Sequence, residues 1–173
     1  MADLSGKRVA FLVEEGYEDL ECWYPKIRLE EEGAETVVAS RSAGIKESKH
    51  GYPIEANYSA MELDAASLDG VVIPGGTGSP DKLRRDEGVT DFVAEIDGQG
   101  KMVAMICHAG WVPISAGILE GRTATSYEAI RDDMKNAGVN YQDEPVVVDG
   151  NLVSSRHPGD LPDFLKAIID KLA

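Results

Sequence analysis

Short apolar runs rich in β-branched residues alternate with longer amphipathic segments, and no other feature of this sequence narrows the choice of fold as far. The strand-like runs cover residues 7–13, 34–41, 68–76 and 102–107, and the helix-like segments cover residues 17–33, 79–101 and 108–119. Strands that are apolar at nearly every position are typical of sheets covered on both faces. Repeated strand-helix-strand units therefore predict an α/β fold whose sheet is mostly parallel, with helices on both faces.

The remaining segments continue this pattern with some changes. Residues 50–58 read as an extended excursion that could form a hairpin arm, and 121–126 as a strand followed by a helix over 127–138. The run 145–155 contains an Asp-Gly turn between two strand-like halves, which predicts a hairpin before a last helix over 160–173. No linker interrupts the chain, so we expect residues 1–173 to form a single domain.

Composition excludes several classes of function. The chain has 173 residues and a formal net charge of −14, which argues against binding nucleic acid through phosphate contacts. The N-terminal apolar run is too short for a secretory signal or a membrane span, so a cytoplasmic location is expected. Two distant cysteines and the separated histidines His50, His108 and His157 predict neither a disulfide framework nor a metal cluster.

Candidate functional residues lie at the carboxyl ends of the predicted strands, where open α/β sheets place their sites. Cys107 ends one strand at the point where a helix is expected to start. Amide groups at a helix N-terminus lower a thiol pKa, so this position predicts an available thiolate nucleophile. The alternative is that Cys107 is a small buried side chain. His108 could act as its base, or could be an exposed or capping histidine.

Two other strand ends carry polar or flexible residues. Glu18 and Glu21 lie three residues apart after the first strand, where they form either a solvated helix face or a carboxyl group near the thiol. Cys22 on the same segment is expected to pack in the core. Gly75 and Gly76 end another strand, where their amides could form an oxyanion hole or simply a tight turn. The loop lacks the glycine and lysine spacing of a dinucleotide or phosphate loop, and no cofactor is expected.

Taken in order, the segments "GYEDLECWYP", "KHGYPI", "IPGGTGSPDKLR", "AMICHAGW" and "VVVDGNLVSSR" resemble the PfpI family of intracellular cysteine peptidases. This family belongs to the superfamily that contains the parkinsonism-linked protein DJ-one and has the class I glutamine amidotransferase-like fold. The resemblance spans nearly the whole chain. It implies a flavodoxin-like three-layer α/β sandwich.

The same resemblance implies a set of site residues. Cys107 would be the nucleophile, His108 its base, and Asp81 would reach the histidine from a neighbouring subunit of a homo-oligomer, either a dimer or an assembly of dimers. Glu21 would contact the cysteine with Glu18 nearby. The resemblance further implies an oxyanion hole and pocket wall formed by Gly75, Gly76, the His108 amide and Tyr127.

Three departures from the family pattern affect this site. Cys-His-Ala-Gly replaces Cys-His-Gly-Pro, which changes the turn around Ala109 and Trp111. Asp81 stands where glutamate is frequent and is one methylene shorter. His157 occupies a position that is often uncharged, and it places a second imidazole near the site.

The expected activity is cysteine-dependent chemistry on reactive carbonyls, of the glyoxalase or deglycase type, converting methylglyoxal to lactate without a cofactor. An intracellular peptidase is one alternative, and a non-catalytic oxidative-stress sensor acting through Cys107 oxidation is another. A glutamine amidotransferase is disfavoured because His157 and Asp160 have the wrong spacing. The expected partner is a small carbonyl compound or a glycated side chain, with peptides as a further option, and neither nucleic acid nor a membrane.

Overall fold

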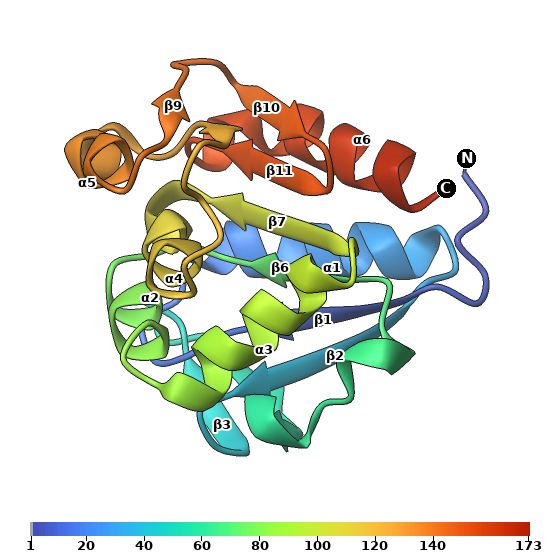
Figure 1. The fold of residues 1–173 in the computed structure, drawn as a ribbon. Helices are drawn as coiled ribbons and strands as arrows, with labels where there is room; N and C mark the ends of the chain where they lie inside the picture. The colour runs from blue at the N-terminus through green and yellow to red at the C-terminus, as the bar shows by residue number, and fades with distance from the viewer. Residues whose placement is uncertain (1) are drawn as a thin grey trace.

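A seven-stranded sheet forms the centre of the protein in the computed structural model. The structure describes residues 2–173, so Met1, the first residue of the predicted domain 1–173, lies outside the described residues. The strand order is β10-β11-β7-β6-β1-β2-β5, and Figure 1 shows the part of it from β10 to β2. All neighbouring pairs are parallel except β10 and β11. The strands are β1 (Arg8–Leu12), β2 (Glu35–Ser40), β5 (Tyr58–Ser59), β6 (Gly70–Ile73), β7 (Met102–Ile106), β10 (Val146–Asp149) and β11 (Leu152–Ser155).

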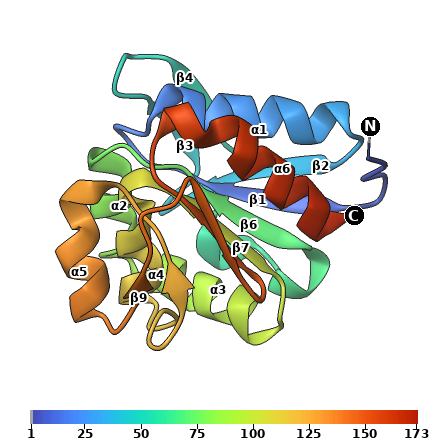
Figure 2. The ribbon, with the colours of Figure 1, turned by 90° about the horizontal axis from the view of Figure 1, so that it is seen from above.

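Helices cover both faces of this sheet (Figure 2). One face packs against α1 (Asp19–Glu31) and α6 (Leu161–Leu172), and the other against α2 (Gly78–Leu83), α3 (Glu87–Gly98), α4 (Trp111–Ser115) and α5 (Arg131–Asn136). Successive strand residues point to opposite faces, so Phe11 packs with Phe164 of α6 while Leu12 joins the cluster that contains Phe92 of α3. The predicted α/β sandwich is confirmed. Within residues 2–173, none of the helices has the length and hydropathy required to cross a membrane.

Two predicted helices are shorter than the sequence pattern indicated. The segment 79–101 is divided into α2 and α3, because the Asp86 side chain accepts a hydrogen bond from the Val89 amide at 3.1 Å and starts a new helix. The segment 108–119 is a 3-10 turn over Cys107–Gly110 followed by α4, which ends before Gly117 at φ +73°. Long continuous helices at these two places were therefore wrong.

The other differences concern short elements outside the main sheet. The predicted strand 121–126 is reduced to β8 (Thr123–Ala124), which pairs with β9 (Asn140–Tyr141). The predicted helix 127–138 starts as a 3-10 turn and becomes regular only in α5. The extended segment 50–58 does form a hairpin arm, because β4 (Pro53–Ala56) pairs antiparallel with β3 (Gly44–Glu47). The hairpin predicted over 145–155 is also confirmed, as β10 and β11.

A buried carboxylate fastens the β3–β4 hairpin to the end of the sheet. Glu14 follows β1 and is 1% exposed, and its Oε2 accepts hydrogen bonds from Ser40 Oγ at 3.0 Å and Arg41 Nε at 2.9 Å. Its Oε1 lies 3.3 Å from Lys46 Nζ in β3. Burial alone would raise the pKa of Glu14, but these partners, led by Arg41, lower the pKa to about 2. The hairpin is thus held where its turn, including Lys49, borders the candidate site.

Candidate active site

A cavity of about 320 Å³ lies at the carboxyl ends of the central strands. Its wall is formed by Glu18, Glu21, Lys49, Gly76, Thr77, Cys107, His108, Tyr127, His157 and Pro158. Most of the residues singled out from the sequence therefore meet in one place, although they come from distant segments. Lys49, Thr77 and Pro158 were not predicted as wall residues, and the "KHGYPI" motif was the signal that could have identified Lys49.

Cys107 occupies a strained turn at the end of β7. Its φ is +63°, and among residues 2–173 it is the one non-glycine residue with a positive φ. A left-handed backbone costs a side-chain-bearing residue roughly 1–2 kcal/mol, so the surrounding structure must hold it there. The Tyr127 amide contributes by donating to the Cys107 carbonyl at 3.1 Å. The turn places Sγ 3.2 Å from His108 Nδ1, although the two residues are neighbours in sequence.

Glu21 lies in the first turn of α1 and is 0% exposed. Its Oε2 accepts a hydrogen bond from the Gly75 amide at 2.8 Å. Burial, reinforced by the nearby Glu18 carboxylate, raises the pKa of Glu21 to about 8. The carboxyl group is consequently mostly protonated at pH 7 and can donate a hydrogen bond to a sulfur or oxygen anion.

Glu18 caps α1 and also faces the hairpin. One of its carboxylate oxygens accepts a hydrogen bond from the Glu21 amide at 2.9 Å, and the other lies 3.7 Å from Lys49 Nζ. The Glu18 side chain therefore fixes the start of α1, orients the turn that carries Glu21, and forms an ion pair with Lys49.

The thiol of Cys107 does not have the lowered pKa that its strand-end position predicted. Burial, together with the charge of ionised Glu21, raises the pKa of Cys107 to about 12, although the amides of His108 and Gly76 act in the opposite direction. The predicted helix after Cys107 is only a 3-10 turn and the short α4, so few aligned peptide dipoles face the sulfur. Protonation of Glu21 removes the repelling charge, which makes the two groups a coupled pair.

His108 is enclosed by two aromatic rings. Its ring centroid lies 5.0 Å from that of Tyr127 and 5.3 Å from that of Trp111, whose indole N–H donates to Asp133 at 2.8 Å. Burial, and to a smaller extent the charge of Lys49, lowers the pKa of His108. The imidazole is therefore neutral near pH 7, as a proton acceptor must be.

The two glycines at the end of β6 leave room that a side chain would fill. A Cβ on Gly75 would lie 2.5 Å from Glu21 Oε2 and 2.6 Å from Cys107 Cβ. Gly76 has φ +80°, and a Cβ there would lie 2.8 Å from the Glu18 amide nitrogen. These glycines allow β6 to approach α1 and Cys107. The Gly75 amide is bonded to Glu21, whereas the Gly76 amide faces the Cys107 sulfur.

Four predicted site residues lie outside the cavity wall, and one of them is Gly75, whose amide donates to Glu21. Asp81 lies on α2 with a side chain that is 55% exposed and paired with Arg85 at 3.1 Å, so within one chain it is not brought to His108. Ala109 is buried in the core on the α3 side of the sheet, and Trp111 contacts the site through the His108 ring. Cys22 is buried in the core on the α1 side, as expected for a packing residue.

His157 borders the cavity at the end of β11. Its Nδ1 accepts a hydrogen bond from the Gly159 amide at 3.2 Å, which leaves the proton of the neutral ring on Nε2. That nitrogen lies 3.8 Å from Asp160. The imidazole expected from the sequence is thus present beside the site.

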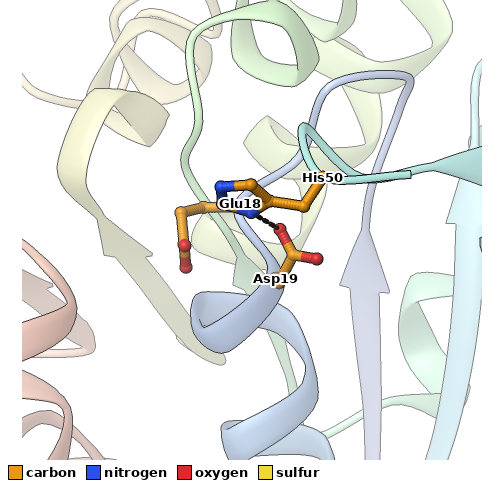
Figure 3. Close-up of side chains that lie close together, drawn as sticks. All are labelled: Glu18, Asp19 and His50. Atoms are coloured by element: carbon orange, nitrogen blue, oxygen red, sulfur yellow. Dashed lines mark hydrogen bonds and ion pairs between the residues drawn. The ribbon is translucent and has the colours of Figure 1, made fainter. Parts of the chain in front are cut away.

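A polar cluster that shares Glu18 with the cavity wall changes one expectation about metals. The three histidines are indeed separate, but His50 lies with Glu18 and Asp19, and one ligand atom from each falls within 4.8 Å of the others (Figure 3). These residues could hold a metal ion. Asp19 already accepts from Ser48 Oγ at 2.6 Å and faces His50 Nδ1 at 2.8 Å, so the cluster joins the hairpin to α1 as it stands.

Comparisons with known proteins agree with this geometry. The model of the DJ-1/PfpI family matches residues 7–171. The Deglycase PfpI of Pyrococcus furiosus is 44% identical over 165 residues, which cover 95% of this chain and 99% of that protein. The putative cysteine protease YraA of Bacillus subtilis is 38% identical over 96% of this chain and 98% of its own length.

Solved structures give the same result. The DJ-1beta of Drosophila melanogaster has a TM-score of 0.90 and 28% identity, covering 100% of this chain and 91% of that one. A two-domain protein from Anabaena variabilis, with dj-1/thij/pfpi-like and ferritin-like domains, has a TM-score of 0.94 and 43% identity. The match covers 96% of this chain but only 48% of that protein. The strained cysteine, the buried glutamate beside it and these similarities show that the chain belongs to the DJ-1/PfpI family.

Proposed function

We propose that this protein is a cysteine-dependent deglycase, which hydrolyses adducts of reactive dicarbonyl compounds on amines and thiols. The observation that carries the proposal is the placement of Cys107 Sγ in a cavity wall beside His108 Nδ1, at 3.2 Å, and the buried carboxyl of Glu21. The names of relatives support it, because several proteins 42–44% identical to this chain are called deglycases.

The chemistry of a methylglyoxal adduct on an amine can be written with these groups. The sulfur of Cys107 replaces the amine at the carbinol carbon, giving the free amine and a hemithioacetal, while His108 takes the thiol proton and passes it to the leaving amine. A proton then moves from this carbon to the adjacent carbonyl carbon, for which His108 or Glu18 is the proposed carrier, and a thioester results. Water hydrolyses the thioester to lactate and the thiol.

This reaction needs no external oxidant or reductant. The carbon of the former aldehyde is oxidised to a carboxyl group while the neighbouring ketone carbon is reduced to an alcohol, so the electrons balance within the substrate. Free methylglyoxal and water would give lactate by the same steps. In the proposed mechanism the amides of Gly76 and His108 stabilise the oxyanion that forms at each addition.

The direct test uses the wild-type protein and a methylglyoxal adduct of N-acetylarginine, with free methylglyoxal and fluorogenic peptides assayed in parallel. We expect free arginine side chains and lactate to appear in equal amounts without any added cofactor. Cleavage of peptides with no adduct removal would instead favour the peptidase. Selective oxidation of Cys107 by peroxide, with no turnover of any substrate, would favour a sensor.

The proposal also includes a homo-oligomer, a dimer or an assembly of dimers, in which Asp81 acts on His108 of a neighbouring subunit. The proposal further includes a single folded domain over residues 1–173 and a cytoplasmic location. Asp81 is suited to action outside its own subunit, because its side chain is 55% exposed on α2 and its sole ion pair within residues 2–173 is with Arg85.

Mixed oligomers would test this arrangement. We expect Asp81→Ala and Cys107→Ala to be inactive separately, and activity to return when the two variants are unfolded and refolded together. Each mixed dimer would contain one intact site, with the cysteine from one subunit and the acid from the other. Asp81→Glu should retain activity. Full activity of Asp81→Ala alone, or a mixture as inactive as its components, would rule out the shared site.

A further inference from the structure

A second cavity adjoins the proposed catalytic one. It has a volume of about 350 Å³ and is lined by Ser126, Tyr127, Glu128, Asp143, Arg156 and His157. Tyr127 and His157 belong to the walls of both cavities, which therefore lie on either side of these two side chains. Nothing in the proposed reaction of a small dicarbonyl compound requires this second space.

The wall between the cavities is fixed in place. The Tyr127 amide donates to the Cys107 carbonyl at 3.1 Å, and the Tyr127 ring packs against His108 with 5.0 Å between centroids. A group in the second cavity would thus occupy a constant position relative to Cys107. A peptide presents neighbouring side chains at a regular spacing, because consecutive Cα atoms are about 3.8 Å apart. Two binding positions at a fixed separation therefore suit an extended peptide substrate.

The charge of the second cavity favours a cation. The Arg156 guanidinium is already matched, because it donates to both Asp160 oxygens at 2.9 and 3.2 Å and to Asp143 at 2.9 Å. Glu128 is exposed and forms no ion pair with any residue of the described chain, 2–173. Within the wall, the carboxylates of Glu128 and Asp143 outnumber the single guanidinium of Arg156, so the wall carries a net negative charge.

We propose that the second cavity is a subsite for a basic side chain of a peptide, lysine or arginine, next to the residue that carries the carbonyl adduct. This inference rests on the proposed deglycase function and specifies its substrate class. The protein would act on adducts within basic segments of polypeptides in preference to free small carbonyls. The first cavity holds the adduct at Cys107, and Glu128 attracts the neighbouring positive charge.

The test compares short peptides that carry a methylglyoxal adduct on one cysteine. The adjacent residue is trimethyllysine, which keeps its positive charge but forms no adduct, or norleucine, or glutamate. We expect kcat/KM of the wild-type protein to be about two- to fivefold higher for trimethyllysine than for norleucine, as for one partly exposed ion pair. Glutamate should be poorest, and added salt should weaken the preference.

Charge reversal assigns the preference to this cavity. Glu128→Lys should invert the order of the trimethyllysine and glutamate peptides. Glu55→Lys on β4, an exposed acid outside both cavities, changes the net charge equally and should keep the wild-type order. Equal effects of the two variants, or no preference in the wild-type protein, would overturn the subsite.

A binding measurement separates this proposal from the proposed function. Fluorescence anisotropy of the labelled peptides without adduct, mixed with Cys107→Ala, should show the same order of affinities. If binding shows the order but the wild-type protein removes no adduct, the deglycase function fails and a basic-peptide site stands. If adducts are removed but neither kinetics nor binding shows the order, the function stands and the subsite is wrong.

Discussion

Replacement of Cys107 by alanine is expected to lower adduct removal by about a thousandfold or more, because loss of the proposed nucleophile removes the covalent route entirely. The loss should appear in kcat, since the remaining wall of the cavity still binds the substrate. Lactate release from methylglyoxal-modified N-acetylarginine measures it. Retention of substantial turnover in Cys107→Ala would end the assignment of this residue as the nucleophile.

A second replacement at the same position shows that the loss is chemical and not a failure to fold. Cys107 has φ +63°, a conformation that glycine adopts without strain. We expect Cys107→Gly to be as inactive as Cys107→Ala but more stable than it, by about 1 kcal/mol in the free energy of unfolding. Urea denaturation of both variants measures this difference. A less stable glycine variant would contradict the strain at this turn.

Gly75→Ala is the other change with a large expected effect. The added Cβ would lie 2.5 Å from Glu21 Oε2, 2.6 Å from Cys107 Cβ and 2.9 Å from the Ile106 carbonyl oxygen. The Ile106 carbonyl oxygen belongs to the backbone, and the position of Cys107 Cβ is set by the backbone next to it. Movement of the Glu21 side chain alone therefore cannot remove the clash. We expect destabilisation of about 1–3 kcal/mol or more, with loss of activity because Glu21 and Cys107 are pushed apart.

Gly98→Ala provides the matched control. Gly98 ends α3, and a Cβ there would have nothing within 4 Å. Alanine is favoured over glycine in helices, so this variant should gain up to about 1 kcal/mol and keep full activity. Thermal unfolding and the adduct assay on both alanine variants make the comparison. A Gly75→Ala protein as stable and active as Gly98→Ala would show that the approach of β6 to the site is not required.

The central strands β1, β2, β6 and β7 were predictable because they are mostly buried on both faces and carry continuous apolar runs. The errors fall where local signals compete. A helical pattern over 79–101 conceals the cap at Asp86, because apolar spacing does not show where one helix ends and another begins at a different angle. The run 121–126 has strand-like composition, yet only two of its residues pair, and they do so outside the main sheet.

At the site, strand ends correctly indicated which segments gather, but not the electrostatics. Burial is the main cause of the raised pKa of Cys107, and Glu21 adds to it because the start of α1 brings this carboxyl group to the cysteine. The distance between Glu21 and Cys107 in the folded protein cannot be read from their spacing along the chain. The position of Lys49 depends in the same way on how the hairpin folds back, and the proposed role of Asp81 depends on a second subunit.

The anchoring of the hairpin through Glu14 has a consequence for how this protein could diversify. Because Glu14 pairs with Lys46 in β3 and with Arg41 just before it, the turn between Glu47 and Pro53 can change its sequence while the β3–β4 pairing stays in register. Lys49 lies on that turn, so substrate preference could be altered there by mutation without disturbing the proposed nucleophile Cys107 or the strands that support it. Such a division between a constant framework and an adjustable rim would allow related enzymes to share chemistry and differ in what they accept.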